Sequence, residues 1–132
     1  MTKDGGLVFA AKTSRFAELS SGRAEDLAFD PAWSTMMRST LQDGQHRNPE
    51  NRSYFTASFY HHPDELESEA TETGWHVRAL LIIEGFAELG PQTESQWSDP
   101  AKREAILEIA RLSESEPSLR GLGPHLLLIA EA

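Results

Sequence analysis

Three short apolar runs, spread over the chain, most constrain what it can fold into. They are residues 7–11 (LVFAA), residues 80–83 (LLII) at the end of an alternating stretch from Trp75 to Glu84, and residues 125–130 (HLLLIA). Each has the length of a buried strand, and none approaches the roughly 20 apolar residues of a membrane-spanning helix. In the segments between these runs, apolar residues recur at helical spacing. We therefore predict an α/β fold in a single domain over residues 1–132, with no membrane partner.

Proline at a first helical position marks three helix starts, at Pro31, Pro63 and Pro100. Asp30 is expected to cap the helix over 31–42, and Gly74 to end the helix that begins at Pro63. A further short helix is expected at 15–20, ended by SSG at 20–22. Residues 43–53 are rich in turn formers and predict an exposed loop, and residues 54–60 predict an extended segment. The run at 7–11 predicts a strand that is covered on both faces.

The charge balance and the absence of cysteine exclude several classes of function. The chain has 21 Asp and Glu against 12 Lys and Arg, a formal net charge of −9, and no cysteine. Nucleic-acid affinity depends largely on Lys and Arg, so no nucleic-acid partner is expected. Without cysteine there are no disulfides, thiolate metal sites or cysteine nucleophiles. The start MTKD has no apolar segment of a signal peptide, so we expect a cytoplasmic protein.

Histidine is the residue that titrates near neutral pH, and general acid–base catalysis usually uses one. His46 lies in a polar segment that either closes over a ligand or is plain surface. His61 and His62 precede a helix beside aromatic residues, so they either face a cavity or cap the helix and meet solvent. His76 and His125 are expected to be structural. No two histidines have metal-ligand spacing, so no metal site is predicted.

Aromatic side chains are concentrated in the connecting segments rather than in the strands. They are Trp33, Tyr54, Phe55, Phe59, Tyr60, Phe86 and Trp97. Such residues either line a small-molecule pocket or form the private core of a long lid. The glycine turns at 5–6 and 121–123 precede strands rather than helices, so neither predicts a phosphate or dinucleotide cradle.

A series of segments, in order, covers nearly the whole chain. It comprises GGLVFAA at 5–11, SRFA at 14–17, DGQHRNP at 43–49, YFT at 54–56, FYHHPDEL at 59–66, ETGW at 72–75, EG at 84–85, SEPSL at 115–119 and HLLLIA at 125–130. In this order and spacing, the series resembles the C-terminal half of class I S-adenosylmethionine-dependent methyltransferases that act on small molecules.

The resemblance implies a partial Rossmann-like sheet. Residues 7–13 would be the fifth of seven strands, residues 14–60 the helical lid and substrate wall, and residues 61–132 a helix–strand–helix–strand tail whose last two strands are antiparallel. The first four strands, with the glycine-rich turn that holds the cofactor, have no counterpart. The chain alone would therefore bind no cofactor, and S-adenosylmethionine would be bound only together with a partner half.

The resemblance also implies roles for individual residues. Trp33, Tyr54 and Phe59 would shape the pocket of the methyl acceptor, and Arg47 would orient an anionic group of this substrate. His46 or His61 would be the general base. The implied function is the substrate-binding part of a split or truncated methyltransferase.

In that family the fifth strand pairs with the fourth, so the segment from Leu7 to Ala11 would present an unpaired apolar edge. We expect either a chain with the cofactor-binding half or a second copy of this chain to cover it. Two alternatives stay open. One is a non-catalytic methyltransferase-like homodimer that binds a small molecule or a protein, and the other is a lid pocket that catalyses a cofactor-free rearrangement.

Overall fold

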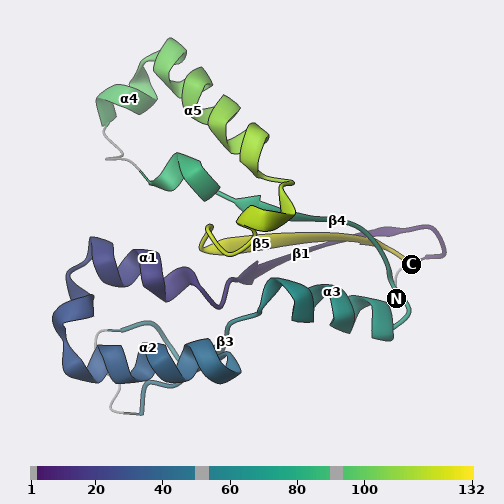
Figure 1. Ribbon diagram of the computed structural model, residues 1–132. Helices are drawn as coiled ribbons and strands as arrows, with labels where there is room; N and C mark the ends of the chain where they lie inside the picture. The colour runs from purple at the N-terminus through teal and green to yellow at the C-terminus, as the bar shows by residue number, and fades with distance from the viewer. Residues whose placement is uncertain (1–2, 50–53, 90–93) are drawn as a thin grey trace.

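The computed structural model describes residues 3–49, 54–89 and 94–132, and it is a mixed α/β fold (Figure 1). Its main sheet has the order β1-β5-β4, with β1 at Leu7–Thr13, β4 at His76–Ile83 and β5 at His125–Glu131. The last strand of the chain, β5, lies in the centre and runs antiparallel to both neighbours. The predicted α/β class and the antiparallel final pair are both present.

The remaining elements lie around this sheet. They are α1 (Ala17–Ala24), η1 (Leu27–Phe29), α2 (Pro31–Asp43), β2 (Gln45–His46), β3 (Ser58–Phe59), α3 (Pro63–Glu72), η2 (Gly85–Glu88), α4 (Glu94–Ser98), α5 (Pro100–Ser113) and η3 (Pro117–Leu119). Helix α3 lies along one face of the sheet, α1 and α2 lie beyond one end of it, and α4 and α5 form an arm on the opposite side (Figure 1). Among the described helices, none is long and apolar enough to cross a bilayer.

The core lies between α3 and the facing side of the sheet. Leu66 and Ala70, one turn apart on α3, pack with Leu80 of β4 and with Leu126 and Leu128 of β5. The strand residues alternate, so every second side chain meets the helix. This small cluster fixes the strands against α3.

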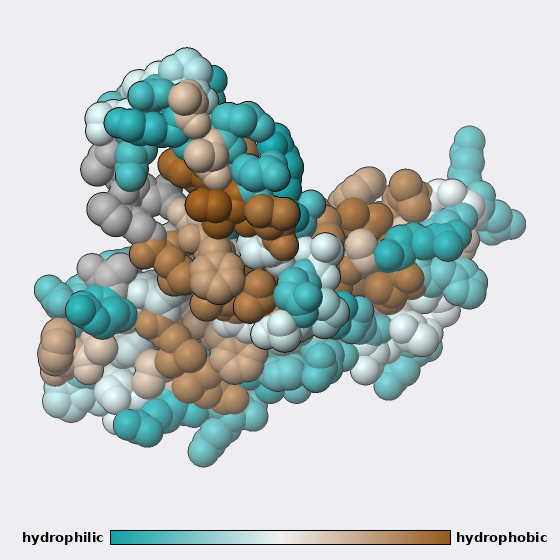
Figure 2. Space-filling model, turned by 45° about the horizontal axis from the view of Figure 1, so that its top comes forward, coloured by the Kyte–Doolittle hydropathy of each residue, from teal (hydrophilic) through white to brown (hydrophobic). Residues whose placement is uncertain are grey.

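The opposite face of the sheet is not closed. Leu7 and Phe9 of β1 are 54% and 62% exposed, and the register places Phe9 beside Ile129. None of the strand residues on this face is fully buried. Figure 2 shows hydrophobic surface on this side of the molecule, beside the arm of α4 and α5. The prediction that the first strand is covered on both faces is wrong, because Ala10 packs towards the α3 cluster on one face whereas Leu7 and Phe9 on the other face are exposed.

The free edge of β1 is defined by its hydrogen bonds. Ala132 N–H donates to Gly6 O and Ser14 N–H donates to Pro124 O, so the even-numbered residues of β1 bond to β5. In an antiparallel pair the alternate residues then direct N–H and C=O outward, here from Leu7 to Ala11. At the far end, His61 N–H donates to Thr13 O at 2.9 Å and closes the edge.

The predicted cap at Asp30 is confirmed, His62 takes the capping alternative, and Asp99 caps α5 in the same way. Asp30 accepts from Ala32 N–H at the start of α2, and Asp99 accepts from Ala101 N–H at the start of α5. His62 Nδ1 accepts from Asp64 N–H at the start of α3, at 3.3 Å. Each cap precedes a proline, whose missing N–H costs nothing in the first turn.

Two local predictions are wrong. Helix α1 runs through residues 20–22, which were expected to break it, because packing outweighs the low helix propensity of serine and glycine. In this turn Gly22 lies against the Trp33 ring, which leaves no room for a Cβ. The predicted exposed loop contains β2, which pairs with β3 and buries His46. Around His46, Asp43, Gln45 and Arg47 are exposed as predicted, and residues 50–53 of the predicted loop lie outside the described residues.

Candidate functional site

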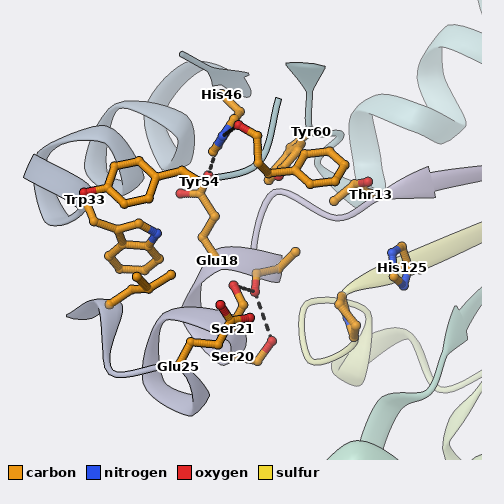
Figure 3. Close-up of a pocket in the computed structure, with 14 residues that line it drawn as sticks. Thr13, Glu18, Ser20, Ser21, Glu25, Trp33, His46, Tyr54, Tyr60 and His125 are labelled. Atoms are coloured by element: carbon orange, nitrogen blue, oxygen red, sulfur yellow. Dashed lines mark hydrogen bonds and ion pairs between the residues drawn. The ribbon is translucent and has the colours of Figure 1, made fainter. Parts of the chain in front are cut away.

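A cavity of about 460 Å³ lies at the end of the sheet where β1 finishes and β5 begins (Figure 3). Thr13 and His125 form its sheet side, and α1 and its C-cap residue contribute Glu18 and Glu25. Its aromatic wall comes from α2 and from the segment around β3, and consists of Trp33, Tyr54, Phe55 and Tyr60. The cavity therefore lies beyond the carboxyl end of β1 and the amino end of β5.

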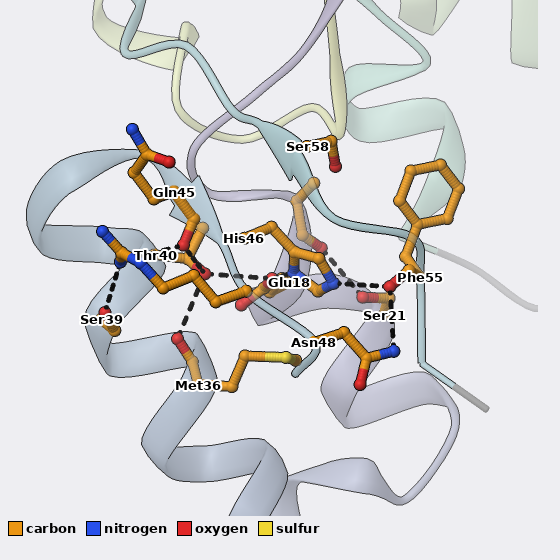
Figure 4. Close-up of polar contacts among 12 residues, drawn as sticks. Glu18, Ser21, Met36, Ser39, Thr40, Gln45, His46, Asn48, Phe55 and Ser58 are labelled. Carbon is orange, nitrogen blue, oxygen red and sulfur yellow. Dashed lines mark hydrogen bonds and ion pairs between the residues drawn. The ribbon is translucent and has the colours of Figure 1, made fainter. Parts of the chain in front are cut away.

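The most buried polar group of the cavity is the pair formed by His46 and Glu18, whose side chains are 2% and 5% exposed. His46 Nδ1 contacts Glu18 Oε1, and His46 Nε2 lies 2.9 Å from the carbonyl oxygen of Phe55 (Figure 4). A carboxylate and a carbonyl only accept hydrogen bonds, so the imidazole satisfies both by donating from both nitrogens. The geometry therefore suits an imidazolium, and the ring stacks on Tyr60 with centroids 5.2 Å apart.

Glu18 keeps one oxygen without a partner. Its Oε1 meets His46 and also accepts from the Thr40 hydroxyl at 3.4 Å. Its Oε2 is buried, and no described group donates to it. An unpaired buried carboxylate oxygen is costly, because it has lost its hydration without gaining a donor. This atom is the main unsatisfied feature of the cavity.

The two tyrosines of the cavity are uncharged hydroxyl groups. Burial and the nearby charge of Glu18 raise the pKa of Tyr60 to about 12. Tyr54 donates its hydroxyl to Asp30, the residue that caps α2. Both rings therefore contribute apolar faces rather than anions at neutral pH.

The cavity brings together three of the six residues predicted for the site, which are His46, Trp33 and Tyr54. Arg47 lies elsewhere: it pairs with Asp43 at 2.7 Å and lines a smaller groove of about 260 Å³ beside α2, which Tyr54 also borders. An anion-orienting role for Arg47 stays a prediction, and it would apply at that groove.

Phe59 and His61 do not line the main cavity. Phe59 is partly exposed and packs edge-on against His61, with ring centroids 4.9 Å apart. His61 is largely buried, with Nε2 at 3.5 Å from Glu69, and burial lowers its pKa. Its role as a base stays a prediction. An imidazole that donates from both nitrogens has no lone pair, so His46 would have to lose the Nε2 proton, and with it the hydrogen bond to the Phe55 carbonyl, before it could act as a base.

Sequence reasoning missed Glu18, Ser20 and Ser21 on α1, and Glu25 at the C-cap of this helix. One signal was available for Glu18: Gly22 follows one helical turn later, and a glycine inside a helix marks a face of close contact. An acid on that face is expected to be buried and paired. The small polar residues were interpreted as a turn, which hid this face.

Among the residues that the structure describes, no three His, Asp or Glu side chains gather to hold a metal ion. No protein-family model matches the chain. No curated protein matches it either.

Proposed function

We propose that this chain is the substrate-binding, C-terminal part of a split or truncated S-adenosylmethionine-dependent methyltransferase, and that a partner chain binds the cofactor. The observation that carries the proposal is the position of the cavity, beyond the carboxyl end of a β1 strand whose outer edge is free. Such a sheet end is where α/β enzymes bind ligands, and a free edge is where further strands of a Rossmann-like sheet would add.

The surroundings of β1 support a missing neighbour on the α3 side as well. An apolar groove of about 320 Å³ runs between α3 and β1, and Val8, Ala10, Leu66 and Ala70 line it. Together with the outward peptide groups from Leu7 to Ala11, it leaves both the sheet and the helical layer unfinished at one border. A partner strand followed by a helix would fill both openings.

The chain itself does not fit the cofactor. The turn after β1, residues 14–16, contains no glycine, and the connection after β4, residues 84–93, contains only the separated Gly85 and Gly90. A glycine-rich strand-to-helix turn is what lets a backbone approach a nucleotide closely. The contribution of this chain would be to hold and orient the methyl acceptor, which accelerates an in-line displacement by positioning.

Reconstitution tests the proposal. The tagged chain is purified from its native host, and co-purifying proteins are tested for S-adenosylmethionine affinity and, with the chain, for transfer of a labelled methyl group. We expect a complex in which transfer needs both chains. A chain that sediments as a stable monomer at micromolar concentration and gains no activity with any co-purifying protein would refute the proposal.

The edge can be tested with matched variants. Ala11→Pro removes an outward N–H that β5 does not use, whereas Ala11→Ser keeps it. We expect Pro to abolish the complex and Ser to keep it, with unchanged circular dichroism for both. A homodimer without cofactor affinity in any mixture would instead identify the non-catalytic alternative, and turnover without cofactor would identify the rearrangement.

A further inference from the structure

The polar groups on the α1 side of the cavity are all hydrogen-bond acceptors. Glu18 Oε2 is buried without a donor. Ser20 and Ser21 donate their hydroxyl hydrogens to the carbonyl oxygen of Ala17, at 3.0 and 3.2 Å, so their oxygens retain only acceptor capacity toward the cavity. Glu25 adds a carboxylate beside the two serines (Figure 3). A ligand that satisfies this side must bring the hydrogens.

Several donors of the opposite wall are engaged within the protein. Both nitrogens of His46 face acceptors, and the Tyr54 hydroxyl donates to Asp30. His125, at the sheet side, has Nδ1 at 3.2 Å from Glu84. These groups therefore offer no spare hydrogen to an anionic ligand.

The charged residues around the cavity also favour a cationic ligand over an anionic one. The residues that line it include Glu18 and Glu25 but neither Lys nor Arg. Glu18 is offset by its contact with His46, and Glu25 has no such offset within the lining. The rings of Trp33 and Tyr60 supply faces that attract cations. An aromatic wall opposite a negatively charged, acceptor-rich wall suits an ammonium group on an apolar body.

We propose that this cavity binds an organic cation, a primary or secondary ammonium carried on a flat apolar body, whose N–H groups donate to the acceptors of α1. The volume of about 460 Å³ lies within the range of small-molecule sites. The identity of this ligand as the methyl acceptor rests on the proposed function, whereas its binding does not.

Three probes share a phenyl ring on a two-carbon chain and differ in the charge of their end group. They are 2-phenylethylammonium, 2-phenylethanol and phenylacetate. Binding to the full chain is measured by calorimetry at pH 7 and fixed salt. We expect the ammonium to bind about tenfold or more tightly than the alcohol, because hydrogen bonds to charged groups are stronger than neutral ones, and phenylacetate to bind most weakly. If the alcohol or phenylacetate binds as tightly as the ammonium, or if no probe binds the folded chain, the proposal is wrong.

A charge variant locates the site. Glu25→Gln removes the exposed carboxylate and leaves the His46–Glu18 pair intact, and Glu104→Gln removes an exposed acid on α5, outside the cavity. Glu25→Gln is expected to weaken ammonium binding about fivefold or more and to leave alcohol binding unchanged, since only a charged probe gains from a carboxylate. Equal effects of the two variants would overturn the assignment. Neither cofactor nor partner enters this test, so its failure and the failure of reconstitution are separate results.

Discussion

Gly22→Ala tests the contact that holds α1 against α2 and so shapes one wall of the cavity. A Cβ at Gly22 would lie 1.9 Å from Cη2 of Trp33, 2.5 Å from Cζ2 and 2.6 Å from Cζ3. Trp33 is only 3% exposed, so its ring can leave this contact only by moving into the cavity that it lines. The substitution therefore forces either the helices apart or the indole out of its place.

Two opposing effects set the size of the change. Replacing glycine by alanine inside a helix normally stabilises by about 0.5–1 kcal/mol. Overpacking a closed core costs about 1–3 kcal/mol, and three contacts below 3.0 Å place this site at the upper end. We expect a net loss of about 2 kcal/mol in the free energy of unfolding, which lowers the urea midpoint by about 1 M.

Urea denaturation followed by far-ultraviolet circular dichroism measures this change. The matched experiment repeats Gly22→Ala in a Trp33→Phe background, where the smaller ring lacks the fused system that the new methyl group meets. There the penalty should shrink or reverse, because the helix preference of alanine remains. A Gly22→Ala variant as stable as the wild type, or an equal loss in both backgrounds, would refute the packing argument.

Three further predictions concern buried and exposed charges. Glu18→Ala leaves the His46 imidazolium without its carboxylate and should lower the free energy of unfolding by about 3–5 kcal/mol; adding His46→Leu should restore part of this loss, and a single-variant loss below about 1 kcal/mol would contradict the pairing. Burial holds the pKa of His61 below its ordinary 6.5, so the unfolded chain takes up the proton more readily and stability falls as pH drops below 6.5. His61→Gln should therefore lose less stability than the wild type between pH 7 and pH 5 in urea melts, whereas His76→Gln, at an exposed position, should follow the wild type. Arg47→Ala breaks an exposed pair with Asp43 and should cost under about 1 kcal/mol, and a larger shift of the urea midpoint would show that the pair is structural.

The elements that the sequence predicts well are those with local signals. Asp30 before Pro31, and the alternation that becomes continuous at residues 80–83, depend on neighbours within one turn or one strand, and both elements form as expected. Local signals do not predict the extent of helix α1. Its second half is stabilised by the contact of Gly22 with Trp33, eleven positions later, rather than by helix propensity. A contact of that kind has no local signature.

The candidate site shows the same limit. His46, Trp33 and Tyr54 were identifiable by residue type, because histidine and aromatic side chains suit a small-molecule cavity. Glu18 was not, since its partner lies 28 positions away on another element. Sequence proximity even misleads here, because adjacent residues of an extended segment point to opposite sides, and Arg47 therefore does not share the cavity with its neighbour His46.

The central place of β5 affects the order in which this molecule can be built. Neither outer strand pairs with the other, and each is joined to the sheet only through residues 125–131. During synthesis, β1 and β4 leave the ribosome before β5, which is the strand that pairs with both of them. Until β5 has been synthesised, both remain unpaired apolar segments. Such distant pairing makes folding slow and exposes unpaired strands to aggregation. Formation of the sheet from β1 and β4 therefore depends on residues 125–131.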